Sequence, residues 1–168
     1  DDKNTRINDL NTFTSEFFCK PAITEMIDKY MIIKTTEPVL MVMRPYQVYA
    51  VEALVRQATL TNRNAYVWHT TGSGKTITSF KTSQILAKEP SINQVFFLVD
   101  RKDLDKQTLD EFNKFKPGCV DLTNNTDKLI EQMKDSTKDL IVTTIQKMAN
   151  ACSSPKYAPI LEKYKDLK

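Results

Sequence analysis

The sequence predicts an α/β fold in which helices flank a mainly parallel sheet, preceded by a helical N-terminal segment. From residue 65 onward, short apolar runs alternate with helical stretches, which is the pattern of parallel-sheet architecture. A glycine-containing loop at residues 69–76 joins the first apolar run to a predicted helix. The chain of 168 residues, 40% hydrophobic and 27% charged, is long enough for one well-buried core.

Two helices are predicted before this alternation begins. Residues 1–12 are polar and expected to fray, and Pro21 suits the first turn of a helix. Four apolar residues then recur at helical spacing and predict one buried face: Ile23, Met26, Ile27 and Tyr30. After a short apolar run at residues 39–43, a second helix opens at Pro45, and residues 59–64 form a polar connector. The predicted buried stripe of this second helix is Gln47, Val51, Leu54, Val55 and Ala58.

Four strands are predicted from apolar runs, at residues 65–69, 94–99, 119–122 and 139–145. The helix after the loop is placed by its motif, because its periodicity is weak. Asp103 suits the N-cap of a helix whose stripe is Leu104, Thr108, Phe112 and Phe115. A short helix before the last strand is indicated by Leu129, Ile130 and Met133. The tail after the loop at residues 153–155 is expected to be helical.

Residues 69–76 read His-Thr-Thr-Gly-Ser-Gly-Lys-Thr and form a phosphate-binding loop of the helicase type. The predicted strand before it and helix after it supply the context that a Walker A motif requires. Gly72 and Gly74 let the backbone curl, so that N–H groups point at phosphate oxygens beside the positive end of a helix. Lys75 then reaches the β- and γ-phosphates, and Thr76 gives a hydroxyl to Mg²⁺. The predicted phosphate-binding set is Thr71, Gly72, Ser73, Gly74, Lys75 and Thr76.

His69 stands where the strict Walker A pattern has its first glycine. Helicase-type loops tolerate this departure, and residues 71–76 match their Thr-Gly-Ser-Gly-Lys-Thr form in full. The simplest competing interpretation is an ordinary Gly-Ser turn followed by a solvated lysine, and the strand-loop-helix context argues against it. We expect His69 to pack or hydrogen-bond beneath the loop rather than to take part in catalysis.

Gln47, near the start of the second predicted helix, is a candidate for adenine recognition. A glutamine amide can donate one hydrogen bond and accept another at the N6 and N7 edge of adenine, which favours ATP over GTP. Arg44 opens the same segment, Arg-Pro-Tyr-Gln, and is included among the expected ATP-binding residues. In isolation Gln47 is more simply a helix residue, so this assignment depends on the other motifs.

Four segments together strongly resemble the motor subunit of type I restriction endonucleases, a family in helicase superfamily two: residues 44–54, 68–76, 97–107 and 142–147. The resemblance implies that residues 41–168 are the N-terminal part of a RecA-like P-loop motor domain. It implies that residues 1–40 are a helical linker from a preceding nuclease domain. It also implies adenine recognition by Gln47, with ATP and Mg²⁺ as cofactors.

The resemblance further implies that duplex DNA contacts Arg101, Lys102, Thr143 and Thr144. Arg101 and Lys102 follow a predicted strand end, where two cations can hold phosphates without reading sequence. The hydroxyls of Thr143 and Thr144 can contact backbone phosphates. Without the resemblance, a solvated turn and ordinary β-forming threonines would be the preferred explanations.

ATP hydrolysis in this class requires an apolar strand that ends in Asp-Glu, and no such motif is present. Residues 95–100 match the first half of this motif, an apolar run followed by Asp, but the next residue is Arg101 instead of Glu. The Asp-Glu pair at residues 110–111 lies on the polar side of a predicted helix. The family places its acidic motif and its second motor domain beyond Lys168. We therefore expect the chain, which lacks an initiating Met, to be a piece of a longer protein that binds ATP without hydrolysing it.

Bulk properties restrict the cellular setting. A formal net charge of +3 does not by itself indicate a nucleic-acid partner. Cys19, Cys119 and Cys152 lack metal-binding spacing and His69 is the only histidine, so reduced thiols are favoured over disulfides or zinc. No apolar run approaches the roughly 20 residues of a membrane span, so no membrane partner and a cytoplasmic location are expected.

These observations favour the ATP-binding portion of a type I restriction motor, whose parent translocates and cleaves duplex DNA beside methylation and specificity subunits. Another superfamily-two helicase or translocase shares every feature of the loop and is the alternative. A small P-loop kinase is less favoured, because Arg56, Arg63 and Arg101 are too dispersed to form its lid. A module that acts only through interactions, with a vestigial loop, is the fourth possibility.

Overall fold

The computed structural model describes residues 6–34, 39–61, 63–100 and 125–164. Its main helices are α1 (Leu10–Phe17), α2 (Lys20–Glu25), α3 (Pro45–Leu60), α4 (Lys75–Leu86), α6 (Thr126–Lys134), α7 (Ile145–Ser153) and α8 (Ala158–Leu161). Short π and 3-10 turns are η1 (Met26–Tyr30), η2 (Pro155–Tyr157) and η3 (Glu162–Tyr164). The strands are β1 (Met31–Lys34), β2 (Val39–Val42), β3 (Val95–Val99) and β4 (Leu140–Thr144).

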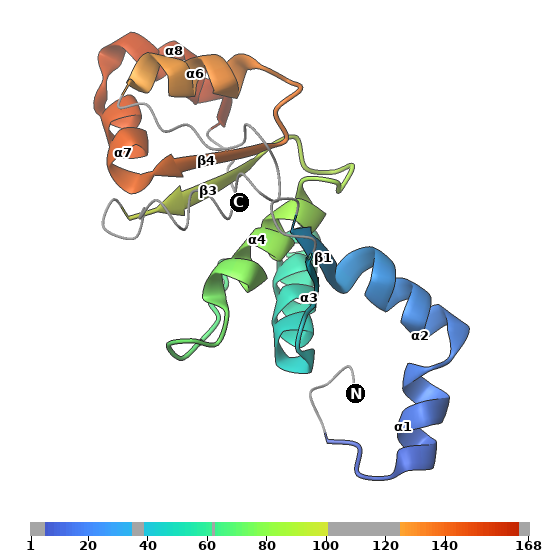
Figure 1. The fold of residues 1–168 in the computed structure, drawn as a ribbon. Coiled ribbons are helices and arrows are strands. Elements are labelled where there is room, and N and C mark those ends of the chain that lie inside the picture. Colours follow the sequence, from blue (N-terminus) through green and yellow to red (C-terminus); the bar gives the residue numbers. More distant parts are fainter. Residues whose placement is uncertain (1–5, 35–38, 62, 101–124, 165–168) are drawn as a thin grey trace.

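Strands β3 and β4 form a parallel pair with helices on both faces (Figure 1). Side chains alternate between the two faces of a strand, and the packing follows this alternation. Leu140 and Val142 pack with Phe80 of α4 on one face. Ile141 packs on the other face with a cluster from α6 and α7. The predicted strands at 94–99 and 139–145, and their parallel arrangement, are therefore confirmed.

The helix predicted around Leu129 is α6, and its three predicted apolar residues are the buried ones of that helix: Leu129, Ile130 and Met133. The side chain of Asn125 caps it by accepting a hydrogen bond from the backbone N–H of Asp127. The predicted helical tail is also confirmed, since η2, α8 and η3 follow one another from Pro155. Together these helices cover one face of the β3–β4 pair.

A second core lies where the β1–β2 hairpin packs on α3. The two strands are antiparallel, and the buried residues of this core are Tyr30, Ile32, Met43 and Val51. Ile77 and Ile85 of α4 pack against the same cluster. The Tyr30 hydroxyl donates a hydrogen bond of 2.7 Å to Glu52 of α3. Part of the segment expected to be a linker thus belongs to the core around α3.

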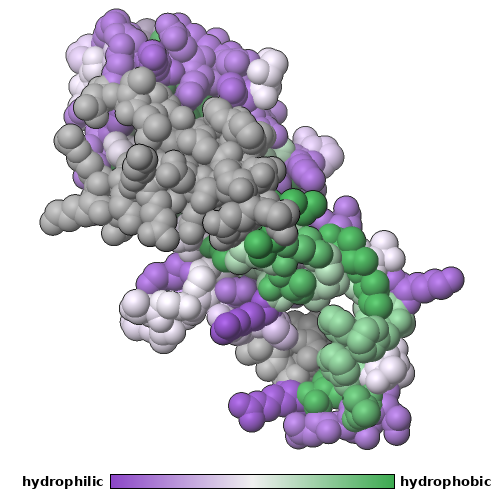
Figure 2. Space-filling model, in the orientation of Figure 1, coloured by the Kyte–Doolittle hydropathy of each residue, from purple (hydrophilic) through white to green (hydrophobic). Residues whose placement is uncertain are grey.

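The outer face of the hairpin carries apolar side chains that are exposed: Ile33, Leu40 and Val42. Figure 2 shows a hydrophobic surface over this region and α2. The helix predicted from Pro21 to Tyr30 is present as α2 followed by η1, and the apolar run at residues 39–43 contains β2.

Helix α3 begins at Pro45 as predicted, because Arg44 is extended and proline suits the first turn. Gln47 and Val51 of the predicted stripe are buried, and its three remaining residues are half-buried. The helix continues to Leu60, so the polar connector predicted at residues 59–64 begins later than expected.

The strand predicted at residues 65–69 is wrong. These residues form no strand, and the side chains of Tyr66 and Trp68 are 87% and 89% exposed. A strand needs a hydrogen-bonded neighbour, and among the described residues none pairs with this segment. Helices α1 and α7 were not predicted. The strand predicted at 119–122 and the helix predicted from Asp103 lie outside the described residues.

Within the described ranges, none of the helices has the length and apolar character needed to span a membrane. The same ranges hold no group of three or more His, Cys, Asp and Glu side chains arranged for a metal ion. Cys19 and Cys152 are exposed free thiols, and Cys119 lies outside the described residues.

Candidate functional site

The loop at residues 69–76 is a compact turn that ends on the N-terminus of α4. Gly72 and Gly74 have φ angles of 78° and 82°, which only glycine adopts without strain. Ser73 folds back on Thr70, since its N–H and its hydroxyl donate to the Thr70 carbonyl over 3.3 and 2.7 Å. Gly74 is the N-cap of α4, and its carbonyl accepts the N–H of Thr78 at 3.0 Å. The loop therefore has the curled backbone that phosphate binding requires.

Two side chains from the first turn of α3 hold this loop. The Tyr46 hydroxyl and the Gln47 Nε2 each donate a hydrogen bond of 2.9 Å to the carbonyl of Ser73. Gln47 Oε1 accepts the backbone N–H of Arg44 at 2.9 Å. A glutamine amide has two N–H donors and two acceptor lone pairs, so one of each remains for a ligand. Gln47 is 7% exposed, and only a small part of it reaches the surface.

Glycine is favoured at position 74 for a second reason besides its φ angle. A Cβ atom at this position would lie 2.3 Å from Nε2 of Gln47, far inside van der Waals contact. A Cβ at Gly72 would meet no atom within 4 Å. The loop is thus packed tightly against α3 at Gly74 and open at Gly72.

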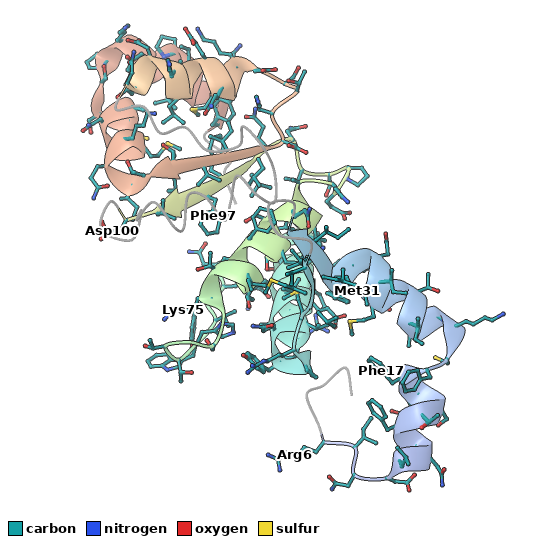
Figure 3. The ribbon with its side chains drawn as sticks, in the orientation of Figure 1. Arg6, Phe17, Met31, Lys75, Phe97 and Asp100 are labelled. Atoms are coloured by element: carbon teal, nitrogen blue, oxygen red, sulfur yellow. The ribbon has the colours of Figure 1, made fainter. Side chains whose placement is uncertain are left out.

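The two lysines of α4 differ in what they contact. Lys75 is exposed at the N-terminus of the helix, and the described residues offer its ammonium no hydrogen bond or ion pair. Lys81 is buried, with its Nζ 3.0 Å from Gln84 Oε1 and 3.5 Å from the carbonyl of Met31. Burial lowers the pKa of Lys81. Of these two lysines, Lys75 is the one available to an anion at the loop, and Figure 3 shows it at the start of α4.

The remaining predicted loop residues take distinct positions. Thr71 is exposed in the turn, and Thr76 is half-buried in the first turn of α4, beside Lys75. Arg44 is exposed at the N-cap of α3. His69 packs edge-on against the Tyr46 ring, with centroids 6.2 Å apart and planes at 77°. His69 thus packs against α3, and its predicted position beneath the loop stays a prediction.

The residues expected to face DNA are not presented in the same way. Thr143 is 2% exposed, and its hydroxyl has no hydrogen-bond partner among the described residues. Thr144 is half-buried and caps α7, since its Oγ1 accepts the N–H of Lys147 at 3.1 Å. Arg101 and Lys102 lie outside the described residues. The structure therefore places Gln47 against the loop, with Arg44 beside it at the N-cap of α3, whereas Thr143 is buried and Thr144 caps α7.

Figure 3 places Lys75 and Asp100 on the same side of the view, where β3 and β4 also have their carboxyl ends. Ligands of open α/β sheets bind outside these ends of the strands. The Asp100 carboxylate accepts a hydrogen bond of 3.3 Å from Nε2 of Gln146, at the start of α7. The loop and the strand ends thus share one side of the fold.

Sequence reasoning missed Tyr46, although it identified the residues on both sides of it. The hydrogen bond from Tyr46 to Ser73 joins positions 27 residues apart, so no local pattern contains it. The one available signal was its place in the Arg-Pro-Tyr-Gln segment that was assigned to nucleotide binding.

Comparison with known proteins identifies relatives over most of the chain. A family model described as SWI2/SNF2 ATPase matches residues 46–167. The chain is 59% identical over 165 residues to the type I restriction enzyme SauCOLORF180P endonuclease subunit of Staphylococcus aureus strain COL. It is 58% identical, over the same length, to the SsaAORF53P endonuclease subunit of Staphylococcus saprophyticus. Each alignment covers 98% of this chain and 18% of the relative, so the chain spans about a fifth of their length.

A shorter relative is matched over most of its own length. This relative, from Mycoplasma pneumoniae, is described as the C-terminal part of a putative type I restriction enzyme endonuclease subunit, MpnIIP. The chain is 39% identical to it over 160 residues, and the alignment covers 88% of this chain and 77% of the relative. With the 98% coverage of the first two alignments, the similarity extends over nearly all of the chain.

Proposed function

Because the chain belongs to the SWI2/SNF2 ATPase family and to the endonuclease subunits of type I restriction enzymes, we propose that it forms their ATP-binding portion. The observation that carries this proposal is the loop at residues 69–76. Its glycines have positive φ, its lysine is unpaired among the described residues, and α3 holds its backbone in place. This combination suits a triphosphate, because two glycines with positive φ, a helix N-terminus and an exposed lysine follow one another along the loop.

Each residue of the site has a separate role in this proposal. Lys75 pairs with the β- and γ-phosphates, and the Thr76 hydroxyl coordinates Mg²⁺, which neutralises phosphate charge when bound. The unused N–H and lone pair of Gln47 read the N6 and N7 edge of adenine. Arg44, exposed at the N-cap of α3, lies beside Gln47 and contacts the same nucleotide.

We further propose that the chain binds ATP without hydrolysing it. The 168 residues contain no apolar run followed directly by Asp-Glu, the pair that this class uses to orient Mg²⁺ and the attacking water. Residues 41–168 would form part of a RecA-like motor domain and residues 1–40 a link to a nuclease domain. The parallel β3–β4 pair with helices on both faces supports the motor assignment.

Duplex DNA and the methylation and specificity subunits are the proposed partners of the parent protein, in the cytoplasm. The parent would translocate duplex DNA with ATP and cleave it. Arg101 and Lys102 are the proposed phosphate contacts. Contact through Thr143 and Thr144 requires the end of β4 to rearrange, because one hydroxyl is buried and the other caps α7.

A second candidate is another superfamily-two helicase or translocase. The match to the SWI2/SNF2 ATPase family favours it, because that match alone does not specify restriction. The restriction assignment is preferred, because the relatives at 59% and 39% identity are both described as restriction endonuclease subunits.

Titration with Mg-ATP tests nucleotide binding. We predict that Lys75→Ala weakens binding about tenfold to a hundredfold, because one charge-assisted contact to phosphate is lost. Lys88→Ala is the matched control, since Lys88 lies just beyond the other end of α4 and should leave affinity unchanged. Equal affinity of Lys75→Ala and the unmodified chain would contradict the assignment of the loop.

A further inference from the structure

Tyr46 touches the phosphate loop at two separate points. Its ring meets His69 at the start of the loop, and its hydroxyl bonds the carbonyl of Ser73 directly before Gly74. Both contacts come from the first turn of α3, where Pro45 fixes the backbone. The loop is therefore positioned from outside by a side chain that has no direct place in phosphate binding.

The Ser73 carbonyl has both of its acceptor positions filled. Tyr46 Oη and Gln47 Nε2 each lie 2.9 Å from it. The peptide unit is planar and trans, so its carbonyl and the N–H of the next residue point in opposite directions. Holding the Ser73 carbonyl toward α3 therefore turns the N–H of Gly74 away from α3.

We propose that Tyr46 is a positioning residue of the phosphate loop, which orients the Gly74 N–H toward a bound phosphate through the Ser73 carbonyl. This inference rests on the proposed nucleotide-binding function and deepens it. Tyr46 and Gln47 have different roles. The Gln47 amide keeps one N–H and one lone pair for a base, whereas the Tyr46 hydroxyl, among the described residues, bonds only the loop. Loss of Tyr46 should therefore weaken every ligand that carries the phosphate chain, whatever its base.

The test compares Tyr46→Phe with the unmodified chain in titrations of Mg-ATP, Mg-GTP and inorganic tripolyphosphate. We expect Tyr46→Phe to weaken all three by the same factor, about fivefold, because one neutral hydrogen bond is removed. Gln47→Leu should instead weaken Mg-ATP more than Mg-GTP. Tyr49→Phe is the matched control, since Tyr49 lies on the same helix, is exposed and makes no hydrogen bond or ring contact with the loop among the described residues.

An amide spectrum provides a readout that needs no ligand. In ¹H–¹⁵N spectra, the Gly74 resonance should shift in Tyr46→Phe and stay in place in Tyr49→Phe, and thermal melting confirms that both variants fold. An unchanged Gly74 resonance, or unchanged tripolyphosphate binding in Tyr46→Phe, overturns the inference. A different result would contradict the proposed nucleotide-binding function, namely equal Mg-ATP affinity of Lys75→Ala and the unmodified chain.

Discussion

The phosphate loop and the carboxyl end of β4 both belong to segments that match one family, yet they present their side chains in opposite ways. At the loop, Lys75 is exposed and has no partner among the described residues, while α3 holds the backbone behind it. At β4, Thr143 is buried and Thr144 caps a helix. A motif match thus places a residue in the fold, and its contacts decide whether its side chain is available to a ligand.

The largest expected effect tests how tightly the loop is built. Gly74→Ala should lower the free energy of unfolding by about 3 kcal/mol, because alanine at φ 82° is strained and its Cβ displaces the Gln47 amide from its hydrogen bonds to Ser73 and Arg44. Gly72→Ala is the matched control: its φ is 78° but its Cβ meets nothing, so about 1 kcal/mol is expected. Chemical denaturation measures both. Equal losses would mean that the packing against Gln47 is unimportant.

A smaller effect tests the structural role of Thr144. Thr144→Ala should cost about 1 kcal/mol of unfolding free energy, because α7 loses its N-cap acceptor. Thr144→Ser should retain most of this stability, since serine caps equally well. If alanine and serine give the same stability, the hydroxyl does not cap the helix in solution.

The smallest effect separates burial from DNA contact. Thr143→Val should raise the free energy of unfolding by up to about 1 kcal/mol, because a buried hydroxyl without a partner among the described residues is removed. Duplex DNA binding, followed across a salt series, should not change. Weaker DNA binding by this variant would mean that Thr143 contacts phosphate. The side chains at the end of β4 would then be available to a ligand, as Lys75 is at the loop.

The loop and the β3–β4 pair were predictable because their signals are local. Gly72 and Gly74 meet a backbone requirement that the adjacent Lys75 and Thr76 make specific. The run that became β4 is buried on both faces of the sheet, and the apolar run of β3 packs half-buried beside it.

The errors have tertiary causes. Residues 65–69 have the composition of a strand, but strand formation depends on a neighbour that the segment itself does not specify. Tyr46 was missed because its partner lies 27 residues away. Thr144 lies in β4 as predicted, but its second role as the N-cap of α7 was missed, although a threonine directly before the apolar residue Ile145 is an N-cap signal.

Helix α4 contributes to two cores at once. Phe80 packs with Leu140 and Val142 against the sheet, while Ile77 and Ile85 pack against the hairpin core. Fraying or displacement of this helix removes apolar contacts from both sides together. We therefore expect the helix that carries Lys75 to couple the unfolding of the two cores, so that the geometry of the loop depends on both of them.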